Sequence, residues 1–134
     1  MDVDTVIAVL LLVTAVGTAA YWVDFFWHGS VHVVEEQWYI RFERAFPIAD
    51  GFMAASAAAA GVGLLTGAAW GQALGLVAAG GLVFLGLMDV TFNVDNGLYR
   101  RLADSGAMRA ELVVNVWTLG VGGFVAVVLV SRFA

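Results

Sequence analysis

The sequence predicts an all-α integral membrane protein whose four transmembrane helices form an antiparallel bundle. Of the 134 residues, 62% are hydrophobic and only 13% are charged, and the mean hydropathy is +0.91. These values lie outside the range of ordinary soluble domains. A helix needs about 20 apolar residues to cross a hydrocarbon core, and four stretches reach that length: residues 3–27, 47–70, 72–94 and 110–130. We therefore expect a single membrane domain over residues 1–134.

The positive charges predict the orientation of the chain. There are six arginines and no lysine. Five of them lie between the first and second spans or between the third and fourth, and only Arg132 follows the fourth span. Because Lys and Arg are enriched in cytoplasmic loops, we expect a multi-pass protein of the cell membrane with both termini outside and both arginine-bearing loops in the cytoplasm.

Composition also excludes several classes of function. The net charge is −5, and no basic patch for a nucleic acid is present. The chain has no cysteine, so disulfides, thiolate metal ligands and thiol redox chemistry are excluded. The expected partners are therefore membrane lipid and a hydrophobic small molecule or a cation.

The end of the first span contains possible metal ligands. If the helix continues through Gly29 and Ser30, Asp24, His28 and His32 follow one another at every fourth residue and share one face. Such a face could hold a divalent zinc or manganese ion. The alternative interpretation is that the two histidines and the nearby acids lie at a hydrated helix end and bind no metal. Haem is disfavoured because two histidines four residues apart on one helix cannot supply opposite axial ligands within a monomer.

Residues 31–46 have an amphipathic pattern. Trp38, Phe42 and Phe46 recur every four residues, and charged residues such as Glu43 lie between them. This pattern predicts an interfacial helix in the headgroup region. A surface that docks a partner protein is the alternative.

The other three spans each carry polar residues near one end. Asp50 is the only charged residue of the second span. Asp89 and Asn93 are four residues apart near the end of the third, and Glu111 and Asn115 have the same spacing in the fourth. Residues at this spacing share a helix face. In the predicted orientation all of these ends lie on the cytoplasmic side, so the polar side chains converge at one level of the bundle.

Ionisable residues inside a membrane are costly unless they are paired or hydrated, and they often indicate a functional site. Interhelical hydrogen bonding that only stabilises the bundle is the alternative. The carboxylates have no lysine partner, which favours a functional site. The candidate catalytic residues are Asp24, Asp50 and Asp89, and the candidate substrate-binding residues are Trp22, Trp27, Phe92, Asn93, Glu111, Asn115 and Trp117.

Crowded carboxyl groups in a medium of low dielectric constant favour one protonated and one ionised member, as acid and base catalysis require. Aromatic faces can stabilise a developing cation. These features suggest an isomerase or cyclase acting on an isoprenoid- or sterol-like lipid. A cation- or proton-binding transporter or channel that works as a homo-oligomer is a second hypothesis, and an accessory or scaffold subunit is a third. The sequence leaves open whether the protein is an enzyme.

The polar residues also suggest an internal repeat with an offset of 65 residues. Two tandem hairpins related by a pseudo-two-fold axis along the membrane normal would produce such an offset. The offset relates Asp24 to Asp89, His28 to Asn93, Arg44 to Arg109 and Asp50 to Asn115.

Overall fold

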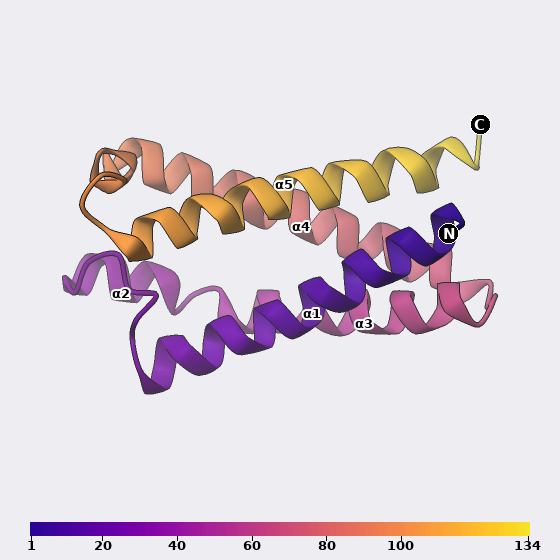
Figure 1. Ribbon diagram of the computed structural model, residues 1–134, viewed down its shortest axis with the longest axis horizontal. Helices are drawn as coiled ribbons and strands as arrows, with labels where there is room; N and C mark the ends of the chain where they lie inside the picture. The colour runs from indigo at the N-terminus through magenta and orange to yellow at the C-terminus, as the bar shows by residue number, and fades with distance from the viewer.

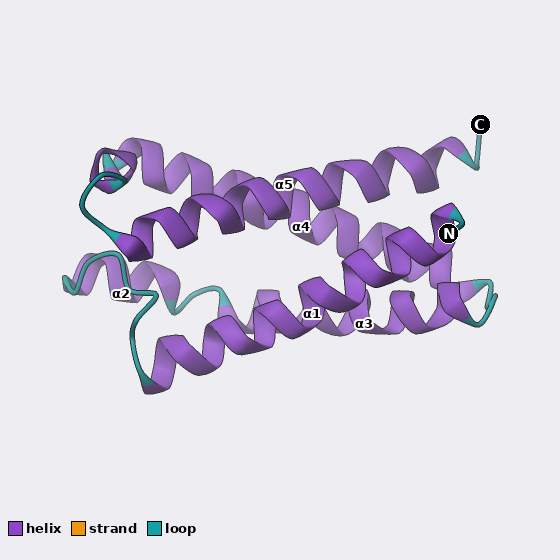
Figure 2. Cartoon of the chain, viewed as in Figure 1, coloured by secondary structure: helices purple, strands orange, loops and turns teal.

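The computed structural model describes residues 1–134, and its regular elements are all helices, with no strand (Figures 1 and 2). Four helical segments are long and apolar enough to cross a membrane: α1, α2 together with α3, α4, and α5. The prediction of an all-α chain with four candidate spans is confirmed. The elements are α1 (Val3–Trp27), α2 (Gln37–Glu43), α3 (Pro47–Leu65), α4 (Trp70–Asp95), the 3-10 helix η1 (Leu98–Arg101) and α5 (Gly106–Ser131).

Side-chain caps fix the starts of the first and last helices. The backbone N–H of Thr5 donates to Asp2 Oδ1 over 2.8 Å, and this bond holds the pKa of Asp2 below its usual value. At the start of α5, the N–H of Met108 donates to the hydroxyl of Ser105. Both caps satisfy N–H groups that have no partner inside the helix.

The first helix ends earlier than the metal-site prediction requires. Its last residue is Trp27, and Gly29 adopts a left-handed conformation with φ of +74°. A glycine in this conformation commonly ends a helix. Residues 30–36 then form a loop, and the predicted interfacial helix over residues 31–46 is reduced to the seven residues of α2. The expected continuous helical face from Asp24 to His32 is therefore wrong.

The long helices pack in the order α1, α3, α4 and α5, while α1 and α5 touch only at a few points. Both termini lie at one end of the molecule, and the loops over residues 28–36 and 96–105 lie at the other (Figure 1). Near the termini, Arg132 forms an ion pair with Asp4. Further along, Trp117 Nε1 donates to Thr14 Oγ1 over 2.9 Å. Beyond that bond, α1 and α5 diverge toward the loop end (Figure 1).

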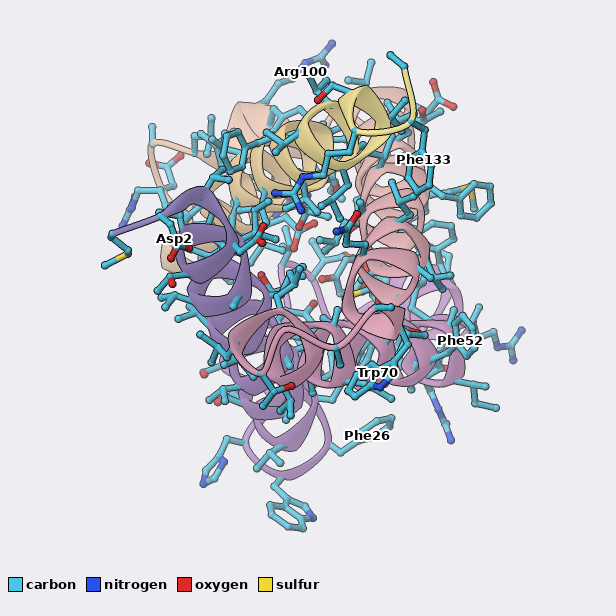
Figure 3. All side chains as sticks on the ribbon, turned by 90° about the vertical axis from the view of Figure 1, so that its right-hand side faces the viewer. Asp2, Phe26, Phe52, Trp70, Arg100 and Phe133 are labelled. Carbon is cyan, nitrogen blue, oxygen red and sulfur yellow. The ribbon has the colours of Figure 1, made fainter.

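Small residues share the interior with leucine and isoleucine, and many other large apolar side chains lie outside. Ala57 and Ala60 are completely buried. Phe26, Phe52 and Phe133 are more than half exposed and project from the periphery of the bundle (Figure 3). Small residues at helix contacts are typical of membrane helices, where close backbone approach replaces the hydrophobic driving force.

The closest backbone approach predicts a local sensitivity to substitution. A Cβ atom on Gly71 would lie 2.7 Å from backbone atoms of Gly63 and Leu64, whereas one on Gly80 meets nothing within 4 Å. We expect Gly71→Ala to lower the free energy of unfolding by about 1–3 kcal/mol, because the backbones must separate. Gly80→Ala, on the same helix, is the matched control and is expected to add about 0.5–1 kcal/mol. Unfolding followed by circular dichroism in detergent measures both changes, and equal stability of the two variants would contradict this close packing.

Candidate functional site

A cavity of about 290 Å³ lies in the half of the bundle where α1 and α5 diverge. Ten of its 18 lining residues are hydrophobic. The wall also contains four carboxyl groups, one from each of four elements, and neither arginine nor histidine contributes to it. These carboxyl groups belong to Glu43 of α2, Asp50 of α3, Asp89 of α4 and Glu111 of α5.

Two asparagines hold the carboxyl group of Glu111. Asn93 Nδ2 and Asn115 Nδ2 each donate to Glu111 Oε1 over 3.2 Å. Asn93 Nδ2 also donates to Asn115 Oδ1 over 3.1 Å. Glu111 is only 6% exposed, and its second oxygen, Oε2, takes part in none of these bonds. The two amides therefore fix the orientation of a carboxyl group that retains a free acceptor oxygen.

Tyr99 extends this network into the loop region. Its hydroxyl donates to Asn115 Oδ1 over 2.6 Å. Burial, followed by the nearby charge of Glu111, raises the pKa of the Tyr99 phenol, so the hydroxyl keeps its proton and acts as the donor. The direction of the bonds is thus from Tyr99 through Asn115 to Glu111, which is the final acceptor.

The other three carboxyl groups have fewer partners. Trp22 Nε1 donates to Asp50 Oδ2 over 2.8 Å. The hydroxyl of Tyr21 lies 3.5 Å from Glu43 Oε2, which is a long hydrogen bond. Asp89 lines the same cavity, and its carboxyl group forms no hydrogen bond with another residue of the protein. The cavity wall therefore carries acceptor oxygens that the protein itself leaves unused.

A second hollow of about 330 Å³ adjoins the first and is lined only by α1, the following loop and α5. The two hollows share Gly17, Tyr21, Glu111 and Val114. Both hollows lie between α1 and α5, and we refer to the two together as the opening between these helices; the four carboxyl groups line the first hollow.

No protein-family model, curated protein or solved structure matches this chain.

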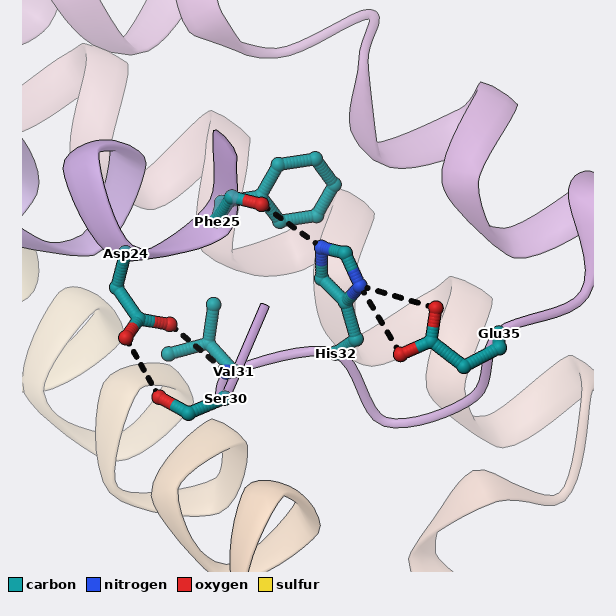
Figure 4. Close-up of polar contacts among 6 residues, drawn as sticks. All are labelled: Asp24, Phe25, Ser30, Val31, His32 and Glu35. Atoms are coloured by element: carbon teal, nitrogen blue, oxygen red, sulfur yellow. Dashed lines mark hydrogen bonds and ion pairs between the residues drawn. The ribbon is translucent and has the colours of Figure 1, made fainter. Parts of the chain in front are cut away.

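The structure separates Asp24 from the other predicted catalytic residues. Ser30 Oγ donates to Asp24 Oδ1 over 2.6 Å, and the N–H of Val31 donates to Asp24 Oδ2 over 3.0 Å (Figure 4). Asp24 lines the second hollow but not the wall that contains Asp50 and Asp89. Its carboxyl group holds the loop that follows α1.

The two histidines are likewise not placed as metal ligands. His32 Nε2 lies 3.0 Å from the carbonyl oxygen of Phe25, and its Nδ1 lies 3.2 Å from a carboxylate oxygen of Glu35 (Figure 4). His28 is exposed at the end of α1. No group of three or more His, Cys, Asp or Glu side chains lies where it could hold a metal ion. The expected ligand face is lost because the helix stops before Gly29.

Of the four aromatic residues predicted to bind a substrate, two line the cavity and two lie outside it. Trp22 and Trp117 line the cavity. Trp27 is 77% exposed, and Phe92 stacks on Phe42 of α2 with ring centroids 3.6 Å apart, outside the cavity lining. Two of the four aromatic candidates are therefore near the carboxyl groups.

Glu43 was not among the predicted site residues. Its sequence pattern places it on the charged face of an interfacial helix, but it is only 6% exposed and lines the cavity. Its spacing of seven residues from Asp50 gives no signal, because α2 ends at Glu43 and α3 begins at Pro47, so the two residues do not share one helix.

Proposed function

We propose that this protein spans the membrane four times with antiparallel helices and performs acid/base chemistry on a lipid-soluble, isoprenoid- or sterol-like substrate. The observation that carries the proposal is the cavity, whose largely apolar wall presents four carboxyl groups and no basic side chain. Its volume of about 290 Å³ is close to the lower limit for small-molecule sites. It suits the reacting part of a lipid whose remainder stays outside.

The proposed entry route is the opening between α1 and α5. In a membrane this opening faces the acyl chains, so a lipid-soluble molecule reaches the carboxyl groups without crossing water. Five arginines lie in or beside α2, in η1 and in the first turn of α5, near the loop end, and they favour a cytoplasmic position for that end, with both termini outside. The substrate would then enter from the cytoplasmic half of the bilayer.

The proposed chemistry needs one proton donor and one proton acceptor. A protonated carboxyl group adds its proton to one carbon of a double bond, and the carbocation that forms loses a proton from a neighbouring carbon to a carboxylate. The result is a shifted double bond with no change in oxidation state. Asp89, which has no bond to the protein to break, suits proton exchange with the substrate. Glu111, held by two amides, suits the role of a fixed anion beside the developing cation.

Aromatic rings add to this stabilisation. Tyr21 and Trp22 lie edge to face with centroids 5.1 Å apart and both line the cavity. Trp117 lines it from α5. Ring faces attract a positive charge by about 0.5–2 kcal/mol, and more strongly where water is excluded.

The proposed tandem repeat relates the opening between α1 and α5 to a second helix contact in the bundle. An offset of 65 residues relates α1 to α4 and α3 to α5, so the contact between α3 and α4 corresponds to that between α1 and α5. The first contact is extensive, whereas α1 and α5 touch only at a few points. A duplicated pair of hairpins would in this way supply one seam for packing and one for a substrate.

Hydrogen exchange tests the proposed reaction before the substrate is identified. The purified protein is incubated in D2O with a panel of sterols and isoprenoids, and mass spectrometry detects deuterium bound to carbon. We expect incorporation by the wild type, and a loss of about 10²–10⁴-fold in Asp89→Asn, the usual contribution of a general acid or base. Asp95→Asn is the control, because Asp95 is an exposed carboxylate at the end of the same helix, outside the cavity.

The absence of exchange for every lipid in the panel, together with no saturable lipid binding, would contradict the proposal. Equal exchange in wild type and Asp89→Asn would reject the role of Asp89. Cation flux in liposomes that requires Asp89 would instead support the transport hypothesis.

A further inference from the structure

We propose that the cavity binds lipophilic ammonium compounds, with the charged nitrogen between Glu43 and Glu111 and the alkyl chain in the opening between α1 and α5. This inference rests on the proposed function and specifies it, because it names the charge that the ligand carries at its polar end. It is derived from three features of the site: unused acceptor oxygens, the missing countercharge, and the shape of the opening.

The first feature is the pair of deeply buried glutamates. Glu43 and Glu111 are each 6% exposed and both line the cavity. Each uses only one carboxyl oxygen in a hydrogen bond: Oε2 of Glu43 and Oε1 of Glu111. A carboxylate accepts only, and an ammonium group donates only. The two free oxygens therefore call for a donor supplied from within the cavity, and charge-assisted bonds of this kind are the strongest ones.

The second feature is the absence of a positive side chain beside the carboxyl groups. Arg132 forms an ion pair with Asp4 at the opposite end of the molecule. The other five arginines are exposed, and none lines the cavity. Buried carboxylates without a countercharge are unfavourable. A cationic ligand would provide the missing charge, whereas a neutral alcohol would provide only a hydrogen bond and a carboxylate ligand would add repulsion.

The third feature is the shape and chemistry of the opening. Gly17 of α1 lines both hollows, and nothing lies within 4 Å of the position that its Cβ would occupy. The space beside it suits an alkyl chain. Val113 and Val114 of α5 also line the cavity and give this chain an apolar surface. Tyr21 and Trp22 flank the route to the carboxyl groups, and their ring faces favour a cation over a neutral group.

Two probes with the same alkyl chain test the charge preference. N,N-dimethyldodecylamine, which is protonated at neutral pH, and dodecanol are titrated into the protein in lipid nanodiscs, and tryptophan fluorescence reports occupancy. Protein-free nanodiscs give the partition baseline. We expect the amine to bind at least about tenfold more tightly than the alcohol, which corresponds to about 1.4 kcal/mol.

Carboxamide variants locate the charge. Glu43→Gln and Glu111→Gln are each expected to weaken amine binding by about tenfold and to leave dodecanol binding unchanged. Asp95→Asn, outside the cavity, should change neither. Because Glu111 also bonds to Asn93 and Asn115, its variant is first checked by thermal unfolding. If it does not fold, Glu43→Gln, which loses only one long bond, decides the test.

The outcomes separate this inference from the proposed function. Saturable binding of dodecanol with equal affinity for the amine would overturn the preference for a cation and leave a lipid-binding cavity. Amine binding that is unaffected by both glutamine variants would also overturn it. If neither probe binds saturably, the cationic ligand fails, while hydrogen exchange with the sterols and isoprenoids decides the proposed reaction separately.

Discussion

Replacing Gly17 with leucine is expected to close the opening to ligands and leave the helix bundle intact. The new side chain meets no neighbouring atom at Cβ and would extend into the space between α1 and α5. A ligand must then displace it, at a cost of about 1–3 kcal/mol, so binding and turnover should fall about tenfold to a hundredfold. Stability should not fall, because leucine favours a helix more than glycine does. Amine titration and thermal unfolding measure the two effects.

Gly80→Leu is the control for the Gly17 variant. Gly80 also has nothing within 4 Å of its Cβ position and lies on a long helix, but it does not line either hollow. The control should gain helix stability without any change in binding. Full binding and turnover in Gly17→Leu would show that ligands do not enter between α1 and α5.

The four spans could be predicted because apolar length is a local property of the chain. The predicted convergence of Asp50, Asp89 and Glu111 on one level followed from helix periodicity and from the alternation of helix ends, and all three line one cavity. Glu43 could not be assigned with the same reasoning. Its burial depends on how α2 lies against the bundle, and an amphipathic pattern alone does not say whether its charged face meets water or a cavity.

The helical face predicted from Asp24 to His32 is interrupted at a single backbone position. A helical face from Asp24 to His32 requires Gly29 to be helical, but Gly29 has φ of +74° and ends the helix. Glycine followed by Ser30 after a long apolar run is a recognised stop signal. Once the helix ends there, the side chain of Asp24 bonds to the loop, and His32 bonds to Phe25 and Glu35. Local turn chemistry therefore took precedence over side-chain periodicity.

Asn115→Leu is expected to lower stability more than any of the other substitutions. The change removes the oxygen that accepts from both the Tyr99 hydroxyl and an Asn93 N–H, and one of the two N–H donors to Glu111. Each hydrogen bond lost from this buried network costs about 1–2 kcal/mol, so we expect a total loss of about 2–5 kcal/mol in the free energy of unfolding, measured by circular dichroism in detergent. Asn96→Leu is the control, because exposed Asn96 bonds only to the carbonyl of Phe92 in its own helix. Its loss should remain below about 1 kcal/mol.

A double variant distinguishes a structural network from a functional one. The cost of Asn115→Leu can be divided by asking how much of it comes from the Glu111 carboxyl group, which loses its Asn115 donor. Adding Glu111→Leu should then recover that part of the stability, since replacing a whole buried polar pair is often less costly than removing one partner. Amine binding should be weakened by about tenfold or more in the double variant, as in Glu111→Gln, because the carboxylate itself is gone. Recovered stability with weakened binding would show that the Glu111 carboxylate serves the ligand. Unchanged binding in the double variant would show instead that the network only holds α4, η1 and α5 together.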